Sequence, residues 1–226
     1  MSEIFCSWSG GKDSCLALYL AQQQGIKVST LFTMMVPKIG RSRSHGIRQD
    51  ILEEQAQLMG MTWLCRSATW DAYRTQFLKG LASLADQGMI GGVFGDIDAD
   101  AHKQWNIDIC AEYGMQAIHP IWQRDRQQLL DLFLSLGFQA RIICVREGVL
   151  DPSFVGRELN HDTLRDLRGE DIDFCGENGE YHTLVVDGPL FSQRLDVAFG
   201  DPQLRDGMWV ADVKRTAQCR NSAMGE

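Results

Sequence analysis

Short apolar runs alternate along the chain with longer segments in which apolar residues recur at helical spacing. Residues 4–8 and 28–35 are apolar runs of the kind that form buried strands. Between them, residues 13–24 have a helical pattern, and Gly25 follows where a helix would end. Strands and helices in this order predict βαβ units, in which helices join parallel strands.

The alternation continues to about Arg146. We expect helices over residues 47–59, 70–87, 99–113 and 125–136, and strands over residues 62–66, 91–95, 115–119 and 139–145. The aromatic residues at helical spacing in 70–87, such as Tyr73 and Phe77, are predicted to be core and not a binding site. The fold class we predict is α/β, with a Rossmann-like parallel sheet and helices on both of its faces.

After Arg146 the pattern changes to short strands separated by Gly, Asp and Pro. Residues 150–153 read Leu-Asp-Pro-Ser, which is turn chemistry. A short helix over 162–167 and strands over 181–187, 194–199 and 209–214 are expected beyond it. We therefore predict an α/β domain over residues 1–146, a smaller α+β domain over 147–215 and a flexible tail over 216–226.

Composition limits the partners of this chain. Its 226 residues can bury a core without metal or disulfide support. The formal net charge of −8 disfavours non-specific binding to nucleic acid or to anionic membranes. The sequence has no run of about 18 apolar residues and no charged leader before an apolar segment. We expect a cytoplasmic protein that binds neither membrane nor nucleic acid, and a homodimer is left open.

The seven cysteines form no recognisable ligand or disulfide pattern. Their number is odd, they are scattered, and no two have C-x-x-C spacing. Most lie in apolar runs, where a thiol behaves as a small hydrophobic group. We predict core positions for them; Cys175 differs from the others in adjoining a polar motif.

A glycine-rich segment separates the first predicted strand from the first predicted helix. Its sequence is Ser9-Gly10-Gly11-Lys12-Asp13-Ser14. Adjacent glycines let the backbone approach an anion closely, and the amides at the start of a helix point toward it. The spacing excludes a Walker A loop, which has four residues between its glycines. The segment therefore predicts a phosphate site of another type, to which Lys12 adds a positive charge.

This hexapeptide, after an N-terminal strand, resembles the pyrophosphate loop of the ATP pyrophosphatases, enzymes that split ATP into AMP and pyrophosphate. The resemblance implies that residues 9–14 bind ATP and that Lys12 stabilises charge on the departing pyrophosphate. A glycine-rich turn without any ligand is the alternative interpretation of the segment.

Other polar loops follow the predicted strands. Ligands of open parallel sheets bind beyond the carboxyl ends of the strands, so these loops should meet. They are residues 41–45, 96–102 and 122–124. Asp96, Asp98 and Asp100 alternate in the second loop, and such carboxylates hold Mg²⁺ together with ATP phosphates. Capping of the next helix explains Asp98 and Asp100 equally well, so we select Asp96, directly after Gly95, as the metal and nucleotide residue.

Further motifs occur in order along the chain. They are Gly95-Asp96-Ile97, Ile121-Trp122-Gln123-Arg124-Asp125 and, over 175–185, Cys-Gly-Glu-Asn-Gly-Glu-Tyr-His-Thr-Leu-Val. Together with the glycine-rich loop, these motifs resemble those of the diphthine–ammonia ligase family. The resemblance extends over residues 4–191. The resemblance implies adenylation of a carboxylate by ATP with Mg²⁺, then attack by ammonia to give an amide, AMP and pyrophosphate. The carboxylate would be that of diphthine, a modified histidine of elongation factor 2.

The resemblance also implies roles for single residues. Glu177 and Glu180 would surround the amine and accept its proton; a turn at Asn178-Gly179 with solvated glutamates is the alternative. Arg124 would clamp a carboxylate and Trp122 would cover a ring, with packing an equal alternative for Trp122. Together with Lys12, these two glutamates and Arg124 form the predicted catalytic set. The other assigned residues are His45, Asn178, Gly179, His182 and Thr183 for substrate, and Asp13 with Asp96 for metal.

Two positions depart from the family's usual sequence, Glu-Gly-Gly-Glu-(Phe or Tyr)-Glu-Thr. Asn178 replaces the first glycine, and His182 replaces the last glutamate, so a ring that can be neutral replaces a negative charge. The second hypothesis is therefore the same ATP chemistry on a small carboxylate metabolite, in cofactor biosynthesis or salvage. A third is transfer-RNA thiolation, which would need a thiolate from Cys144 or Cys175. A catalytically silent nucleotide sensor is the fourth.

Overall fold

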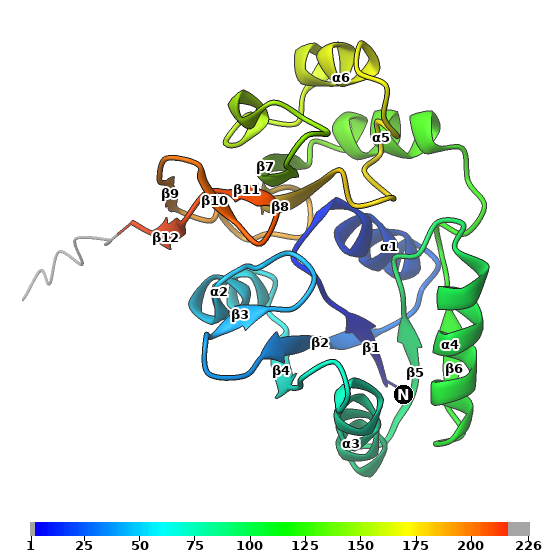
Figure 1. Ribbon diagram of the computed structural model, residues 1–226. Coiled ribbons are helices and arrows are strands. Elements are labelled where there is room, and N and C mark those ends of the chain that lie inside the picture. Colours follow the sequence, from blue (N-terminus) through cyan, green and yellow to red (C-terminus); the bar gives the residue numbers. More distant parts are fainter. Residues whose placement is uncertain (1–2, 217–226) are drawn as a thin grey trace, which may run out of the picture.

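The computed structural model describes residues 3–216, so nearly all of the predicted tail, together with Cys219, lies outside the described residues. Its first part alternates strands and helices (Figure 1): β1 Glu3–Ser7, α1 Lys12–Gln23, β2 Val28–Val36, β3 Arg41–Ser42, α2 Gln49–Leu58, β4 Thr62–Ser67, α3 Tyr73–Asp86, β5 Met89–Val93, α4 Asp100–Ala111 and β6 Gln116–Ile118. The second part comprises α5 Arg126–Ser135, β7 Gln139–Arg146, the 3-10 helix η1 Pro152–Phe154, α6 His161–Arg168, β8 Tyr181–Asp187, β9 Val197–Phe199, β10 Gln203–Arg205, β11 Met208–Val210 and β12 Val213–Arg215.

The main sheet has six strands in the order β3-β2-β1-β5-β6, with β4 paired to β2. Every pairing in it is parallel except that of the short strand β3 with β2. Parallel strands need helical crossovers, which is why helices follow the strands so regularly here. The predicted α/β class with a parallel sheet is confirmed.

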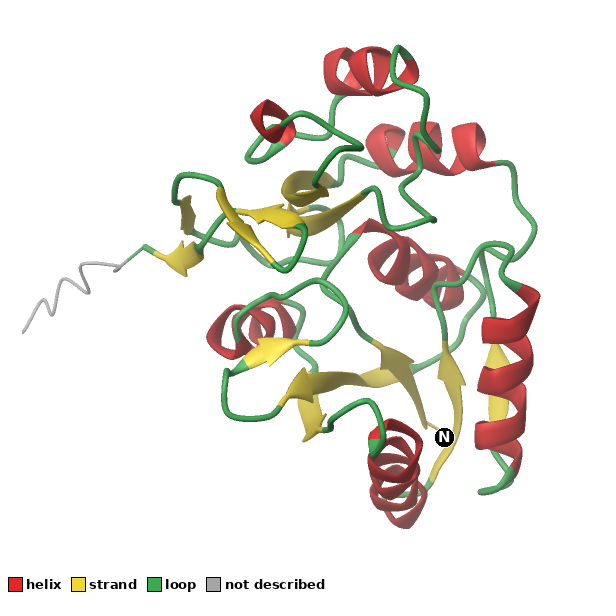
Figure 2. Cartoon of the chain, viewed as in Figure 1, coloured by secondary structure: helices red, strands yellow, loops and turns green. Residues whose placement is uncertain are grey.

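Helices cover both faces of this sheet, as the cartoon in Figure 2 shows. Side chains of a strand alternate between faces, and in β1 they separate two buried clusters. Ile4 and Cys6 pack with residues of α1 and α2, whereas Phe5 packs with residues of α3 and α4. Near-continuous apolar strands in the sequence are the signature of this two-sided burial.

Residues 139–146 do not extend the parallel sheet as the alternation predicts. Strand β7 pairs antiparallel with β8 and β11, in a second sheet of order β10-β11-β7-β8. An apolar run predicts a buried strand but not its partner, which explains the difference. The run predicted over 209–214 is likewise two strands, β11 and β12, and β12 pairs with β9. The domain boundary at residue 146 stays a prediction.

The second sheet docks on the first through a buried glutamine of α2. Gln55 is fully buried, and its amide Nε2 donates to the carbonyls of Gly10 (3.2 Å) and Val185 (2.7 Å). The indole N–H of Trp8 donates to the Gln55 Oε1 at 3.0 Å. The amide of Val185 also donates a backbone hydrogen bond to the carbonyl of Gly10 at 3.0 Å. Strand β8 is thus fixed against the glycine-rich loop.

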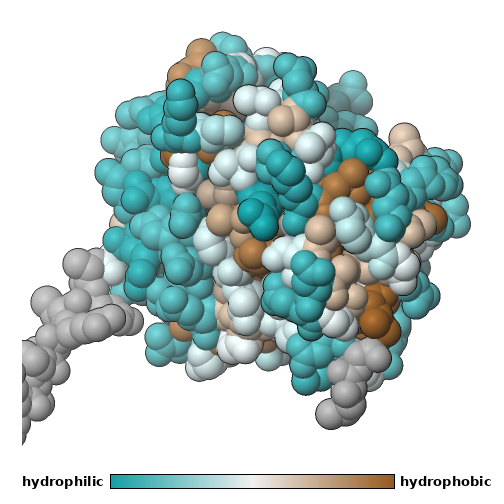
Figure 3. Space-filling model, turned by 90° about the horizontal axis from the view of Figure 1, so that it is seen from below, coloured by the Kyte–Doolittle hydropathy of each residue, from teal (hydrophilic) through white to brown (hydrophobic). Residues whose placement is uncertain are grey.

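The surface offers little continuous apolar area on the face seen in Figure 3, where hydrophobic residues form separate small patches among hydrophilic ones. The large hydrophobic side chains that are exposed in the described residues come from several elements: Ile39, Trp70, Ile90, Ile107, Tyr113 and Leu204. Among the described helices, none combines the length and hydropathy needed to cross a bilayer.

We expect Gln55→Leu to lower the free energy of unfolding by about 2–3 kcal/mol, because Trp8 and Val185 would keep buried polar groups without partners. Leucine is close in size, so the loss reports the hydrogen bonds. Gln57 lies exposed on the same helix, and Gln57→Leu should change stability by less than about 0.5 kcal/mol. Urea denaturation of both variants checks this; equal stabilities would contradict the structural role of Gln55.

Candidate functional site

The loop from Ser9 to Ser14 joins β1 to α1 and is held in shape by its own serines. The hydroxyls of Ser9 and Ser14 lie 3.0 Å apart, and the amide of Gly11 donates to Ser9 Oγ at 3.2 Å. Gly10 has a positive φ of 84°, and a Cβ there would come within 2.8 Å of Ile47 Cδ1. Glycine is therefore required at this position for backbone conformation and for space.

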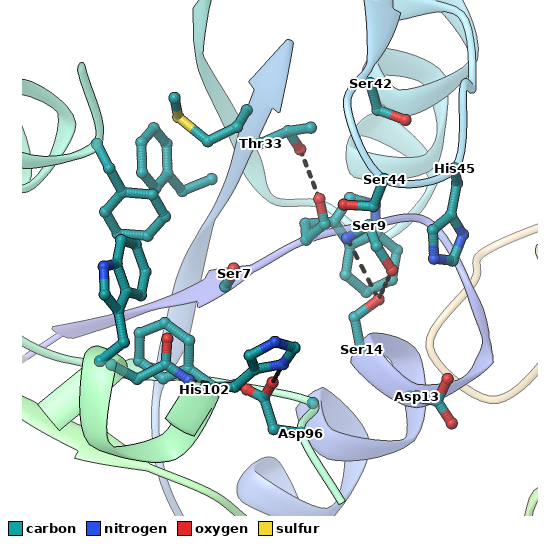
Figure 4. Close-up of a pocket in the computed structure, with 18 of the residues that line it drawn as sticks. Ser7, Ser9, Asp13, Ser14, Thr33, Ser42, Ser44, His45, Asp96 and His102 are labelled. Carbon is teal, nitrogen blue, oxygen red and sulfur yellow. Dashed lines mark hydrogen bonds and ion pairs between the residues drawn. The ribbon is translucent and has the colours of Figure 1, made fainter. Parts of the chain in front are cut away.

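A large cavity of about 510 Å³ opens at the ends of β1 and β5 and beside β2, a size typical of small-molecule sites. Its polar wall includes the predicted residues Ser9, Asp13, Ser14, His45, Gly95 and Asp96. Its other wall is aromatic and consists of Phe32, Trp70, Tyr73, Phe77, Phe94 and Trp105. Figure 4 shows several aromatic rings on the side away from His45 and Asp13. Three of the predicted loops do meet, and the cavity is apolar at one end and polar at the other.

The aromatic wall is where the core prediction for Tyr73 and Phe77 was incomplete. Both residues belong to α3; Phe77 is buried in the core and Tyr73 packs half-buried against it, yet both also line the large cavity. The ring of Trp105 lies 5.0 Å from that of Phe77 and 5.8 Å from that of Tyr73. Helical spacing is the same for a core side chain and for one that borders a cavity, so the sequence could not separate the two roles.

Among the three alternating aspartates, only Asp96 lines the large cavity. Its carboxylate accepts a hydrogen bond from Asn106 Nδ2 at 2.8 Å and lies 3.3 Å from His102 Nδ1. Asp98 binds Arg126 instead, and Asp100 lies in the first turn of α4, where it complements the helix dipole. Of the three aspartates, the structure therefore places only Asp96, the residue selected from the sequence, at the large cavity.

A second, smaller cavity of about 150 Å³ lies on the other side of Asp13 and His45, which line both cavities. It lies between the start of α1, the loop over 176–179 and the start of β8. Five predicted residues line it in addition to those two: Lys12, Glu177, Gly179, His182 and Thr183. Asn178 and Glu180 line neither cavity. Most of the residues predicted from the C-terminal motif thus meet the glycine-rich loop.

Lys12 is buried beside its neighbour. Its Nζ lies 2.8 and 2.7 Å from the two carboxylate oxygens of Asp13, and its backbone amide donates to Thr183 Oγ1 at 3.1 Å. Burial is the largest single effect and disfavours the ammonium, but the acidic groups around it, led by Asp13, together outweigh burial and raise the pKa of Lys12 well above its usual value. Lys12 is therefore charged and faces the small cavity.

The two glutamates of the motif have different environments. Burial and the nearby Asp13 carboxylate raise the pKa of Glu177 to about 7, which suits a group that exchanges protons near neutral pH. Glu180 is 5% exposed, and its Oε1 accepts from the Asp173 amide and from Asn178 Nδ2. The solvated alternative is therefore wrong for Glu180, whereas Glu177 is half-buried, and a turn does close between Gly176 and Gly179.

His45 and His182 form a stacked pair, with ring centroids 4.5 Å apart and planes inclined by 26°. Burial lowers the pKa of His45 to about 4 and, together with the adjacent His45 ring, that of His182 to about 3. Both rings are therefore neutral at pH 7. The Nδ1 of His45 must donate to the carbonyl of Thr183, 3.0 Å away, so its Nε2 is an acceptor. Nothing in the sequence indicated this contact between distant residues.

Arg126, which the sequence reasoning missed, reaches the segment directly before the motif loop. It pairs with Asp98 and, through Nη1, with Asp173 at 2.8 Å. Asp173, whose side chain is 6% exposed, accepts the amides of Cys175 and Glu177. The only signal in the sequence was an arginine in the first turn of a predicted helix.

Arg124 and Trp122 line neither cavity. Arg124 is exposed, and the ring of Trp122 lies 4.4 Å from Lys103 Nζ. Residues 122–124 therefore do not join the other predicted loops at either cavity. Their loop packs on the outside of the molecule, beside α4. The substrate roles of these two residues stay predictions.

The described cysteines behave as the core prediction requires: Cys6, Cys15, Cys110, Cys144 and Cys175 are buried, and Cys65 is half-buried. Burial raises the pKa of Cys144 and of Cys175 to about 12. Neither thiol is therefore the low-pKa thiolate that transfer-RNA thiolation would need. The Cys175 sulfur lies within 4.8 Å of ligand oxygens of Asp13 and Glu177, but a protonated thiol is a poor partner for Mg²⁺.

Two family models match the chain. The one described as the diphthamide synthase N-terminal domain matches residues 2–117, and the one described as the diphthamide synthase C-terminal domain matches residues 125–218. The two matches together cover most of the chain, including the glycine-rich loop and the motif after Cys175.

Curated relatives with the name diphthine–ammonia ligase are similar over part of the chain. The proteins of Bos taurus and Homo sapiens are each 34% identical over 107 residues, which is 46% of this chain and 40% of theirs. The protein of Schizosaccharomyces pombe is 34% identical over 91 residues, which is 39% of this chain and 15% of its own length. The matches thus span less than half of each relative.

One solved structure, from Methanocaldococcus jannaschii and described as a predicted subunit of tRNA methyltransferase, has a TM-score of 0.46 and 17% identity. The match covers 83% of this chain and 98% of that one. A TM-score in this range carries no statement about function.

Removal of the Arg126 side chain should destabilise the protein, because the buried Asp173 carboxylate would lose its cation. We expect Arg126→Met to lower the free energy of unfolding by about 2 kcal/mol. Asp98 is the exposed partner of the same arginine, and Asp98→Asn should cost less than about 1 kcal/mol. Urea denaturation compares the two; equal losses would show that Asp173 does not depend on Arg126.

The stacked histidines should make the folded protein acid-sensitive. As pH falls from about 6.5 toward 4, the unfolded state binds protons at His45 and His182 that the folded state does not, so stability decreases. Glu177 acts in the opposite direction, because its raised pKa lets the folded state hold a proton that the unfolded state releases.

The comparison of variants isolates the histidine contribution. Between pH 6.5 and 5, His182→Gln should reduce the pH slope of the unfolding free energy by up to about 1.4 kcal/mol per pH unit. His161 is exposed at the start of α6, and His161→Gln should leave the slope unchanged. Urea denaturation at each pH gives the slopes; the same slope in all three proteins would argue against a neutral stacked pair.

Proposed function

Because the chain belongs to the diphthamide synthase family, we propose that it is an ATP-dependent ligase that activates a carboxylate as an acyl adenylate and converts it to an amide. The observation that carries the proposal is the pair of cavities that share Asp13 and His45 as a common wall. One cavity is large and half aromatic, and the other is small and polar. A reaction in two steps needs a nucleotide site and an adjoining place for the second reactant.

The large cavity suits ATP. Its aromatic wall offers flat apolar surface for a base, and the loop from Ser9 to Ser14 at its polar end offers amides at a helix start for phosphates. Lys12, which belongs to that loop, lines the small cavity and is held there by Asp13, which borders both cavities. Its fixed position lets it stabilise charge that develops on pyrophosphate without reorganisation during the reaction.

Mg²⁺ would be held by Asp13 and Asp96, whose carboxylates line the same cavity. Each carboxylate accepts hydrogen bonds from its neighbours but has lone pairs left, and oxygen ligands are those that Mg²⁺ prefers. When bound, the ion would neutralise charge on the phosphate oxygens.

In the second step, Glu177 would take the proton of the attacking amine. Its position in the small cavity and its pKa of about 7 fit a proton acceptor. Glu180 is predicted as a catalytic residue but is better placed to hold the motif loop, because its Oε1 accepts hydrogen bonds from the Asp173 amide and from Asn178 Nδ2. Thr183 would fix the loop of Lys12 through its hydroxyl.

For the carboxylate substrate, the relatives named diphthine–ammonia ligase favour diphthine on elongation factor 2, with ammonium as the nitrogen source. A small carboxylate metabolite is the second candidate. It is favoured by His182, which stacks on His45 at the cavity where the family has a glutamate. Trp122 and Arg124, which lie outside both cavities, stay candidates for substrate contact, and a homodimer stays untested.

A product assay decides between these. Purified protein is supplied with labelled ATP, Mg²⁺ and ammonium, with and without diphthine-bearing elongation factor 2. AMP and pyrophosphate that appear only with the factor, together with its amidation, are the expected result. AMP formed only with a metabolite extract would select the second candidate, and ADP in place of AMP would refute the proposal.

Within the same assay, Glu177→Gln should reduce amide formation by about 10²- to 10⁴-fold, because the isosteric amide cannot accept a proton. The KM for ATP should not change, since Glu177 does not line the large cavity. Glu170 is exposed just before the motif, and Glu170→Gln should behave as the unmodified protein. An active Glu177→Gln protein would remove Glu177 from the mechanism.

A further inference from the structure

Arg126 joins the two parts of the chain beside the candidate site. It is the first residue of α5, in the second part, and its guanidinium pairs with Asp98 of the first part and with Asp173 of the second. We propose that Arg126 is a positioning residue for the second step of the reaction, and that it holds Glu177 in register with the nucleotide site through these two carboxylates. This inference rests on the proposed ligase function, and it names the residue that aligns the second step with the first.

The chain of bonds from Arg126 to Glu177 is short. Nη1 of Arg126 lies 2.8 Å from Asp173 Oδ2, and the same oxygen accepts the backbone amide of Glu177 at 2.8 Å. The other oxygen of Asp173 accepts the amide of Cys175 at 3.0 Å. The Asp173 side chain is nearly buried, so water weakens these bonds little. One carboxylate therefore fixes the backbone that carries Glu177 to the guanidinium.

The other arm of the bridge is bidentate. Nη2 of Arg126 lies 3.0 Å from Asp98 Oδ1, and Nε lies 3.2 Å from Asp98 Oδ2. Two parallel bonds of this kind fix the orientation of a guanidinium as well as its distance, which a lysine ammonium cannot do. Asp98 is two residues from Asp96, which lines the large cavity. The bridge therefore begins at the nucleotide site.

The loop of Asp98 is held firmly without the ion pair. Ile97 is buried, and its carbonyl accepts the amide of Gln123 at 2.6 Å. Gly95 packs so closely on the start of α1 that an added Cβ would lie 2.8 Å from the backbone nitrogen of Ser14. Asp98 is therefore a fixed point from which the guanidinium can position another segment.

The segment 173–180, which carries Glu177, lacks such anchors. Within the described residues 3–216, no hydrogen bond or ion pair joins this segment directly to residues 3–118. Arg146, which donates to a carbonyl of the segment at 2.6 Å, belongs to the second part itself. The next bond to the first part lies in β8, at Thr183. The alignment of Glu177 with the nucleotide site thus depends on Arg126.

The two steps of the reaction should therefore depend differently on Arg126. Adenylation takes place in the large cavity, whose loops are fixed by other bonds. Amide formation also needs Glu177 beside the attacking nitrogen, and a group misplaced by about 1 Å can slow a reaction roughly 100-fold. Loss of the bridge should slow the second step and leave the first unchanged.

The two steps can be measured separately. Exchange of labelled pyrophosphate into ATP, with Mg²⁺ and diphthine-bearing elongation factor 2 or the active metabolite fraction, reports adenylation. Protein preloaded with ATP and the same carboxylate is then mixed with ammonium chloride, so that amide formation reports the second step. Arg126→Met should slow amide formation by about 10- to 100-fold, with the exchange rate and the KM for ATP unchanged.

Two further variants sharpen the test. Asp98→Ala removes only the link to the first part and should slow amide formation about tenfold, again without an effect on exchange. Arg126→Lys keeps the charge but not the fork, so it should not restore the rate. Arg215→Met is the control, because it removes another ion pair between the two parts, Arg215 with Glu54 at 2.6 Å, away from both cavities. It should leave both steps unchanged.

Equal slowing of both steps, or unchanged amide formation in the Arg126→Met and Asp98→Ala proteins, would overturn the positioning role. If Arg126→Met does not fold, Asp98→Ala decides.

A measurement without substrates separates the two proposals. Deuterium uptake of the segment 173–180 should be faster in Arg126→Met than in the unmodified protein, and unchanged in Arg215→Met. This result in a protein that forms no AMP would support the hold of Arg126 on the segment and refute the ligase. AMP-forming amidation at the normal rate in Arg126→Met would support the ligase and overturn the positioning role.

Discussion

The architecture depends on the bonds that join strand β8 to the glycine-rich loop. The carbonyl of Gly10 accepts hydrogen bonds from the Val185 amide and from the Gln55 side chain. The same side chain accepts from the indole N–H of Trp8 and donates to the carbonyl of Val185. These groups are buried, so any separation of the two sheets would leave polar atoms without partners, at a cost of about 1–3 kcal/mol each. The loop and the motif beyond Cys175 are therefore held as one unit, and the small cavity exists only because of this contact.

The same contact explains the electrostatics of the site. Once β8 lies on the start of α1, Lys12 is buried, and Glu177 and the two histidines are half-buried beside it. Lys12 remains charged because Asp13 pairs with it, whereas the histidines lack a carboxylate partner and become neutral. Burial alone would neutralise all of them; the difference comes from which side chain has a counter-charge within reach.

The sequence was sufficient for features that depend on local order. Alternating apolar runs and helices predicted the parallel sheet, and glycines before Lys12 predicted the loop at the start of α1. It was insufficient where partners are distant in the chain: β7 was assigned to the wrong sheet, and the stack of His45 on His182 was not foreseen. Arg126 was missed for the same reason, since its importance comes from Asp173, which only the fold brings near.

His182 affects the charge of the small cavity more than its shape. A glutamate at this position would put a third carboxylate beside Asp13 and Glu177, with Lys12 as the only cation among the residues that line the cavity. Like charges at short distance raise carboxyl pKa values, so Glu177 would hold its proton more strongly and accept another less readily. A neutral ring keeps the pKa of Glu177 at about 7 while still offering an acceptor. The departure from the family sequence is thus compatible with the same proton transfer, and it changes mainly the affinity of the cavity for cations.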